Sequence, residues 1–438
     1  MSLFKEVFVR PRWGRRFIEL TFAINIRPHR GRMLLNNDIA VWYYFIRYLY
    51  TTMPSQKKTT ENYFLAESVR LINSGDDYFN TLEKIIDFAE NNIHLQTYIF
   101  DEDKTGVTIS DALIRAAKRG VQVFVLIDAY GSKSLSFEFI KGLQQNGIHF
   151  RFFSPLFSRE SIYLGRRLHH KIVVIDKKIA LVGGINIADK YHGTDVGPAW
   201  LDYAVLIKGA VCIQLFNLCD HFFEKKTLKR KFELQNSSDK FPGEILVRFT
   251  RNDWIVRKNE IYRSYHQSLN NSKKSAVFIA SYFLPGYKFR KILKAARKRG
   301  VEIKIILAGK SDLPFLWYAE KYLYDFYLKN GIEIYEWRNS VMHGKALIID
   351  NEWTTIGSYN HNYLSHYRSI ELNVEIKDVP FADQFIKQID TVIEVSCDKI
   401  NVQGNLHSAG WLLRARNYIS FLVYKGIMQV LVPVPTKK

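Results

Sequence analysis

A polar pattern that occurs twice is the feature that most constrains how this chain folds. The first copy, H-x-K-x4-D-x6-G-G-x-N, spans residues 169–186, and the second, with serine in place of one glycine, spans 343–360. A single H-x-K triplet is commonplace and is usually a pair of surface side chains. Two complete copies, separated by the length of a domain, indicate that the chain contains two related folding units.

Apolar runs and helix endings repeat in the same order in the two halves. In the first half, runs at 93–100 and 121–128 enclose a helix that ends in KRG. In the second half, runs at 275–283 and 301–309 enclose a helix with the same ending. A glycine after a basic last turn is typical of a helix C-terminus. Strands that alternate with helices predict an α/β fold with a mostly parallel sheet in each half.

The domain boundaries follow from this repeat. We predict a first α/β domain over residues 66–223 and a second over 241–400. The stretch 224–240 is polar and basic, as expected of a linker between them. Residues 1–65 match neither half and form an N-terminal extension, and 401–438 form a hydrophobic and basic tail.

The motif residues have the chemistry of a phosphoryl-transfer site. The four residues between each Lys and Asp are apolar, IVVI and ALII, which indicates a buried strand. Side chains alternate along a strand, so His169 and Lys171 share one face and His170 points away; His343 and Lys345 pair in the same way. Histidine attacks phosphorus or transfers a proton near neutral pH, and lysine or asparagine binds phosphoryl oxygens. Two copies therefore supply a nucleophile and a general acid.

The amino-acid composition limits the kinds of molecule that the protein can bind. The chain has 63 Lys and Arg against 43 Asp and Glu, a formal charge of +20, which favours nucleic acid or an anionic membrane surface. Its three cysteines have no close pair, which excludes a disulfide framework and a cysteine-rich zinc site. No run reaches the roughly 18 apolar residues of a membrane span. Segments 39–53 and 411–435 mix aromatic, aliphatic and cationic residues, which is typical of helices at a membrane interface or packed on the protein body.

The duplicated motif resembles the phospholipase D superfamily over about residues 66–400. The segment 74–132 is similar to the opening of bacterial cardiolipin synthases, and 199–212 and 367–376 resemble the segments that follow each motif there. The chain looks like the short type without transmembrane helices. The resemblance implies two pseudo-twofold-related phospholipase D-like domains with the active site at their interface. It also implies a covalent phosphohistidine intermediate and neither a metal nor another cofactor.

The resemblance assigns roles to ten side chains. His169 becomes the nucleophile and His343 the general acid, although the residues alone are equally compatible with the reverse. Asp202 and Glu371 follow these histidines in the chain and are expected to orient them, unless they are ordinary acids at strand ends. The predicted catalytic set is His169, Lys171, Asp176, His343, Lys345 and Asp350, with Asn186 and Asn360 as phosphate-binding residues.

Asp176 and Asp350 have two readings, because each lies across a buried strand from its histidine. They either take part in the chemistry or act structurally through nearby cations.

With this resemblance, we predict a cardiolipin synthase-type phosphatidyltransferase that moves a phosphatidyl group from phosphatidylglycerol, or a related phospholipid, to a lipid hydroxyl. We expect it to bind peripherally at the cytoplasmic face of a bacterial membrane. The alternative is a phosphodiesterase, of the phospholipase D or nuclease type, that uses water as acceptor. A binding module with a decayed site does not fit two complete motifs. The segments 39–53 and 411–435 favour lipid over DNA as the partner. The second lipid substrate and the oligomeric state are left open by the sequence.

Overall fold

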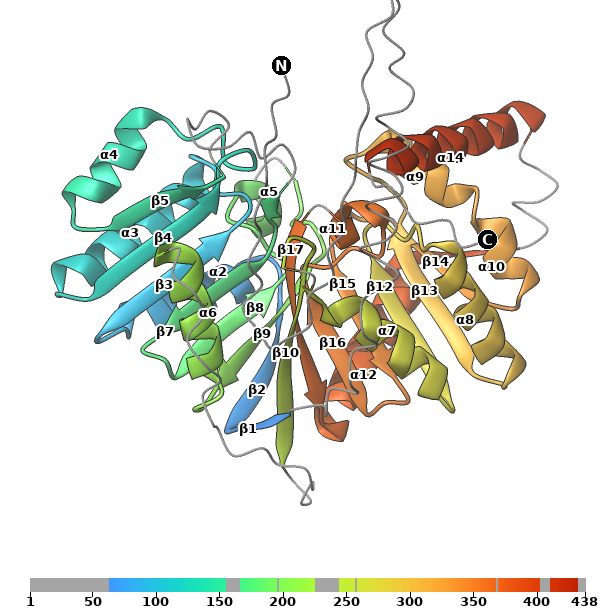
Figure 1. Ribbon diagram of the computed structural model, residues 1–438, viewed down its shortest axis with the longest axis horizontal. Helices are drawn as coiled ribbons and strands as arrows, with labels where there is room; N and C mark the ends of the chain where they lie inside the picture. Colours follow the sequence, from blue (N-terminus) through green and yellow to red (C-terminus); the bar gives the residue numbers. More distant parts are fainter. Residues whose placement is uncertain are drawn as a thin grey trace, which may run out of the picture. The chain divides into compact units, whose positions relative to one another are not determined.

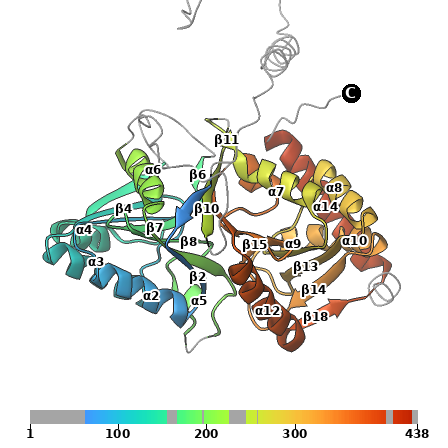
Figure 2. The same ribbon diagram turned by 90° about the horizontal axis from the view of Figure 1, so that it is seen from below.

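The computed structural model describes residues 63–154, 166–194, 197–224, 244–256, 258–367, 369–401 and 410–431. The predicted extension 1–65 and linker 224–240 lie almost wholly outside these residues, and so does the interface-like segment 39–53. The described residues form two β-sheets that lie side by side, with helices on their faces (Figures 1 and 2).

Seven strands form the first sheet: β2 (Ser68–Asn73), β3 (Asn92–Thr97), β4 (Gln122–Asp128), β5 (His149–Phe153), β7 (Lys171–Ile175), β8 (Ile179–Gly183) and β9 (Tyr203–Lys208). Their order is β2–β9–β8–β7–β3–β4–β5. Only the pairs β3–β4 and β4–β5 are parallel, and the other neighbours are antiparallel.

Eleven strands form the second sheet: β1 (Phe64–Ala66), β6 (Arg167–Leu168), β10 (Ile245–Asp253), β11 (Lys258–Asn259), β12 (Ser275–Ala280), β13 (Glu302–Ala308), β14 (Glu333–Trp337), β15 (Lys345–Ile349), β16 (Trp353–Gly357), β17 (Ser369–Lys377) and β18 (Cys397–Ile400). The run β10–β17–β16–β15–β12–β13–β14 repeats the strand order of the first sheet. β1 and β18 extend its edges, while β11 pairs with β10 and β6 with β17.

The repeated strand order confirms two related α/β domains, but the expectation of mostly parallel sheets is wrong. Within the repeated order of seven strands, parallel pairing is limited to β3–β4–β5 and β12–β13–β14. The motif strands β7 and β15 run antiparallel to both of their neighbours. Only three residues separate β7 from β8, which is too short for the crossover that a parallel pair needs. The strand β1 also departs from expectation, because it begins within the predicted extension and pairs with β10 of the second domain.

The helices of the first half are α2 (Asp76–Asp87), α3 (Lys104–Lys118), α4 (Phe137–Gln145), α5 (Asp189–His192) and α6 (Cys212–Glu224). Those of the second half are α7 (Glu260–Asn271), α8 (Tyr287–Lys298), α9 (Pro314–Lys321), α10 (Tyr324–Lys329), α11 (Tyr363–Tyr367), α12 (Val379–Ser396) and α14 (Trp411–Leu431). The predicted crossover helices are α3 and α8. Each is followed by a glycine with a positive φ, 90° at Gly120 and 91° at Gly300, which a residue with a side chain rarely adopts.

One hydrophobic cluster spans both sheets and holds the two halves together. It contains Ile172 and Val174 of β7, Ala346 and Ile348 of β15, and residues of α6 and α12. Full burial of a large aliphatic side chain contributes roughly 1.5–3 kcal/mol. The shared core therefore fixes the amino ends of β7 and β15 relative to one another, and these are the strand ends that carry the motif histidines.

Candidate active site

The two motif lysines are buried beside the histidines that precede them. His169 and His343 come just before β7 and β15, and Lys171 and Lys345 are the first residues of these strands. The Lys171 ammonium group donates to the carbonyl oxygen of His169 at 2.5 Å, and Lys345 donates to that of His343. The two halves therefore hold their His-Lys pairs in the same way.

His170 lies away from this arrangement, in agreement with the strand alternation. Its side chain is fully buried, with Nε2 2.9 Å from Oε1 of Gln96 and its ring beside Phe222 of α6. Gly344 occupies the same place in the second copy. A Cβ there would lie 2.9 Å from the Ile279 side chain, so the second copy has no room for a histidine at this position.

Each motif histidine is anchored on the sheet of the other half. The strand β6 pairs in parallel with β17, and the backbone N–H of His169 donates to the Ile370 carbonyl at 3.0 Å. This contact brings Nδ1 of His169 to 2.9 Å from Oε2 of Glu371, whose side chain is fully buried.

His343 contacts the first half in the equivalent way. The backbone N–H of His343 donates to the Leu201 carbonyl at 2.8 Å, and its Nδ1 lies 2.6 Å from Oδ2 of the buried Asp202. The expectation that each acid orients the histidine preceding it in the chain is therefore wrong, because the pairs are crossed. The cause is the short strand pairing between halves, which no spacing in the sequence reveals.

The Gly-Gly and Gly-Ser pairs of the two motifs lie against these acids. A Cβ on Gly184 would lie 2.4 Å from Oδ1 of Asp202, so only glycine leaves space for that carboxylate. At the equivalent position, the Ser358 hydroxyl donates to Oε2 of Glu371 at 2.5 Å. The motif residues Gly184 and Ser358 therefore set the position of the carboxylate in their own half. That carboxylate in turn orients the histidine of the other half.

The hydrogen bond between each histidine and its carboxylate decides which imidazole nitrogen can react. With Nδ1 of His169 and of His343 facing a carboxylate, the proton belongs on Nδ1 and the Nε2 lone pair is free to react. Burial lowers the pKa of His169 although Glu371 opposes it, and burial and Lys345 lower the pKa of His343 well below its usual range. In the free protein both imidazoles are thus neutral near pH 7, which is the form of a nucleophile, and a histidine that acts as general acid must first take up a proton at Nε2.

Burial also shifts the other charged groups. It lowers the pKa of Lys171 to about 7 and that of Lys345 to about 8, although nearby carboxylates favour the charged forms. It raises the pKa of Asp202 to about 7, against the effect of Lys345. A bound anionic phosphate favours protonated lysines, so the site is built to gain positive charge when a phosphate enters.

The two asparagines of the motifs are hydrogen-bonded to neighbouring groups, and Asn186 is connected to His343 through Tyr191. Asn186 accepts from the Ile99 N–H at 3.0 Å and donates to the Tyr191 hydroxyl at 2.8 Å. That hydroxyl is 3.5 Å from Nε2 of His343. Asn360 accepts from the Ser281 hydroxyl at 2.7 Å. The sequence analysis missed Tyr191, whose only signal is its place five residues after Asn186.

Asp176 and Asp350 lie at the far ends of β7 and β15, away from the histidines. Asp176 accepts three backbone N–H groups of residues 90–92 at 2.8–2.9 Å, and Asp350 accepts three of residues 273–275 at 2.7–2.9 Å. The structure does not bring them together with the other motif residues. Their partners are backbone amides that precede β3 and β12, rather than the cations expected.

Comparison with known proteins agrees with this geometry. A family model described as "Cardiolipin synthase, PLD-like domain" matches residues 82–216 and 265–393. Cardiolipin synthase B of Escherichia coli (strain K12) is 34% identical over 343 residues, which are 76% of this chain and 82% of that protein. The major cardiolipin synthase of Bacillus subtilis (strain 168) is 30% identical over 339 residues, 75% of this chain and 69% of that protein.

Solved structures show the same fold. The phosphatidylserine synthase of Haemophilus influenzae Rd KW20 superposes with a TM-score of 0.67 at 15% identity, over 85% of this chain and 97% of that chain. The fold and the duplicated site define a protein of the phospholipase D superfamily. Within it, the chain belongs to the cardiolipin synthase family. The prediction of a phosphatidyltransferase of this superfamily is thereby confirmed.

Among the described residues, neither a cluster of metal ligands nor a membrane-spanning helix is present. In this part of the chain, no group of three or more His, Cys, Asp or Glu side chains is arranged to hold a metal ion. Within the same residues, no helix has both the length and the apolar character needed to cross a membrane.

The hydrogen bonds of Asp176 predict a role in stability. Asp176→Ala leaves three backbone N–H groups without their acceptor, so we expect the free energy of unfolding to fall by about 1–3 kcal/mol. The turnover number of the folded variant should stay near that of the wild type. Urea denaturation measures the first quantity, with the exposed Asp111→Ala as the control. If the variant is as stable as the wild type but has no activity, Asp176 takes part in the reaction and the structural role is wrong.

Proposed function

We propose that the chain transfers a phosphatidyl group from phosphatidylglycerol, or a related phospholipid, to a lipid hydroxyl and so makes cardiolipin. The observation that carries this proposal is the crossed pair of neutral histidines. Each has its Nδ1 held by a buried acid of the other half, beside a buried lysine. Two such groups provide the nucleophile and the general acid of a two-step transfer.

Binding of the anionic phosphate favours uptake of a proton at Nε2 of His343. In the first step, Nε2 of His169 attacks the phosphorus, the bond from phosphorus to the glycerol oxygen breaks, and His343 gives this proton to that oxygen. In the second step, a lipid hydroxyl attacks the phosphohistidine, His343 takes its proton, and His169 leaves. Lys171 and Lys345 stabilise the negative charge on the phosphoryl oxygens. Two observations support this assignment: the His169 side chain is 15% exposed against 9% for His343, and Nε2 of His343 faces the Tyr191 hydroxyl.

The proposal includes peripheral binding to anionic lipid at the cytoplasmic face of the membrane. The charge of +20 favours an anionic surface. Cys212, Cys219 and Cys397 are free thiols, as is usual in a reducing compartment.

The test of the reaction is product identification. We expect purified protein to convert phosphatidylglycerol vesicles to cardiolipin and to leave plasmid DNA intact. His169→Ala and His343→Ala should each lower the rate by about 10²–10⁴-fold. His170→Ala, whose side chain faces Gln96, is the matched control and should keep most of the activity. Phosphatidic acid as the main product would favour water as the acceptor, and cleavage of the plasmid would favour a nuclease.

The intermediate provides a second test. In His343→Ala the second step lacks its base, so a phosphatidyl group should accumulate on His169. Rapid quenching at alkaline pH, where phosphohistidine survives, followed by peptide mass spectrometry measures this adduct. An adduct on residue 343 in His169→Ala, with none on His169 in His343→Ala, would reverse the two roles. If neither variant carries an adduct during slow turnover, the two-step scheme is wrong.

The lysine pKa values predict the pH dependence. The free enzyme loses the proton of Lys171 near pH 7 and that of Lys345 near pH 8, and a neutral lysine no longer attracts the substrate phosphate. We therefore expect kcat/KM to fall as pH rises through about 7 to 8. Lys171→Arg keeps its charge in this range, so its residual activity should fall only with Lys345. A profile that stays flat to pH 9 in the wild type would contradict this explanation.

A further inference from the structure

The helix α14 packs on the second domain with only one side. Ser420, Tyr424 and Met428, spaced four residues apart, are buried, and Tyr424 and Met428 belong to the core of that domain. At about 100° per residue, Trp411 and Leu422 fall on the opposite side of the helix. They are 76% and 44% exposed. The reading of segment 411–435 as a helix packed on the protein body is therefore confirmed for one side of its described part. The other side is exposed, and its contact with a membrane stays a prediction.

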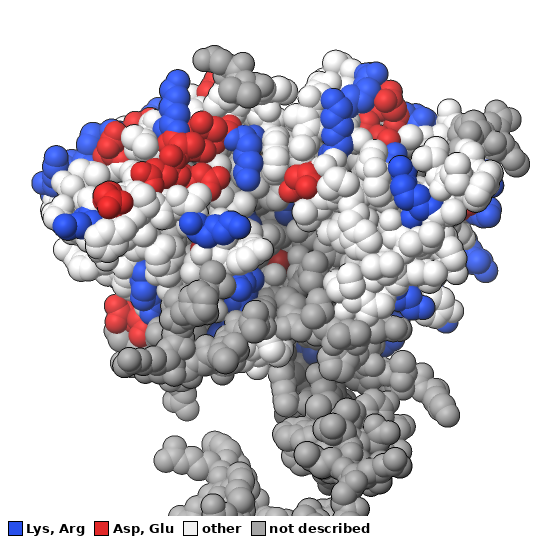
Figure 3. Space-filling view, turned by 90° about the horizontal axis from the view of Figure 1, so that it is seen from above, with Lys and Arg blue, Asp and Glu red and all other residues white. Residues whose placement is uncertain are grey.

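This unpartnered side of α14 lies at the same edge of the sheet as the candidate active site. The helix packs on α9, which follows the carboxyl end of β13 (Figure 1). The loop before α9 reaches the site. Asp312 in this loop accepts a hydrogen bond from the Tyr282 hydroxyl, and its negative charge acts to raise the pKa of His343. Seen from above in Figure 3, most of the surface on the half with α14 is uncharged, and its charged groups are mainly Lys and Arg.

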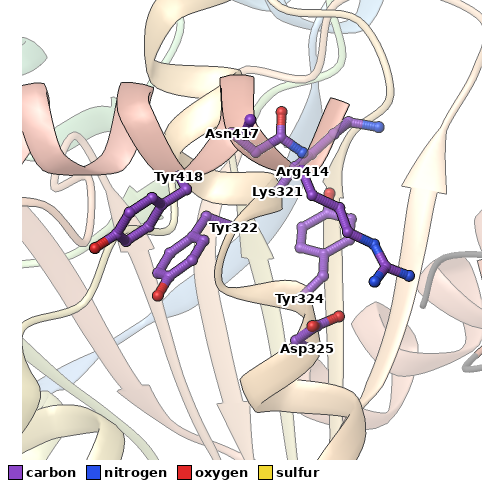
Figure 4. Close-up of a pocket in the computed structure, with 8 residues that line it drawn as sticks. Lys321, Tyr322, Tyr324, Asp325, Arg414, Asn417 and Tyr418 are labelled. Carbon is purple, nitrogen blue, oxygen red and sulfur yellow. The ribbon is translucent and has the colours of Figure 1, made fainter. Parts of the chain in front are cut away.

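A pocket of about 400 Å³ opens between α9, α10 and α14 (Figure 4). The rings of Tyr322 and Tyr418 form one wall, with centroids 5.4 Å apart. Among the described residues, the Arg414 guanidinium has no hydrogen bond or ion pair, whereas Lys321 is paired with Glu336 at 3.0 Å. The Asp325 carboxylate also lines the pocket. The pocket thus offers one unpaired cation, one acceptor and an aromatic wall.

We propose that this pocket binds the headgroup of an anionic glycerophospholipid in the membrane while the exposed side of α14 inserts among the acyl chains. Arg414 pairs with the phosphate, and Asp325 accepts a glycerol hydroxyl, which favours phosphatidylglycerol over phosphatidic acid. The helix carries Arg414, Arg416 and Lys425 and no acidic residue, so its charge is complementary to such a surface. The subsite contains none of the motif residues. It deepens the proposed membrane binding and rests on it.

The test is co-sedimentation of the full chain with vesicles of phosphatidylglycerol and phosphatidylcholine. Arg414→Gln should weaken binding about fivefold, the effect of one interfacial charge. The double change Ile419→Ser and Leu422→Ser should weaken it about tenfold or more, including at high salt. Phe88→Ser and Lys298→Gln, exposed residues at the opposite edge of the sheets, are the matched controls and should bind like the wild type. Asp325→Ala should lose the preference for phosphatidylglycerol over phosphatidic acid vesicles.

Activity on detergent-dispersed phosphatidylglycerol, measured on the same variants, separates this proposal from the reaction itself. It should stay unchanged, and circular dichroism should show the same fold. If both α14 variants bind vesicles as well as the wild type, the proposal is wrong. If they instead lose self-association in analytical ultracentrifugation, the exposed side is an interface with a second copy. If the wild type has no activity on dispersed substrate but the vesicle results hold, the proposed reaction fails and the lipid site stands.

Discussion

The hydrogen bonds between each motif histidine and a carboxylate of the other half are the contacts on which the site depends. Asp202 and Glu371 are fully buried, and a buried charge without a partner costs several kcal/mol. Each half gives its own acid a hydrogen bond, from the Tyr203 N–H to Asp202 and from the Ser358 hydroxyl to Glu371, but the imidazole that completes the site comes from the other half. The free energy for docking the halves comes from the hydrophobic cluster that spans them. The polar contacts then select one register for that docking.

The order of seven strands is repeated in the two sheets, but the side chains around the two histidines differ. Glycine lies under the shorter Asp202, whereas serine donates to the longer Glu371. The Ser358 hydroxyl holds the Glu371 carboxylate that faces Nδ1 of His169. His343 instead has the Tyr191 hydroxyl near its Nε2. The proposed roles, one histidine as nucleophile and the other as general acid, require two histidines that are chemically distinct. The surroundings, rather than the histidines, supply that distinction.

The sequence predicted the fold class, the two domains and the strand alternation that separates His169 from His170, because these depend on local patterns. It failed where distant segments meet. The crossed pairs depend on β6 adding to the second sheet, and the two residues of that strand carry no periodicity to recognise. The antiparallel course of β7 was missed because its buried sequence is compatible with either direction. The role of Tyr191 depends on a contact across 152 residues.

The positions of Asp176 and Asp350 explain why the motif has the length it has. β7 has five residues at about 3.3 Å each, beginning with Lys171, and Asp176 follows its far end. At that end, the aspartate has a left-handed backbone, with φ of 50°, and its carboxylate accepts the amides that lead into β3. Asp350 does the same for β12, with φ of 54°. The strand is thus held at one end by the hydrogen bonds of its aspartate and at the other by the contact of its histidine with the opposite sheet. In the proposed reaction the histidine must meet phosphorus within tenths of an ångström, which needs both attachments. This requirement explains why an aspartate far from the histidine belongs to the same motif.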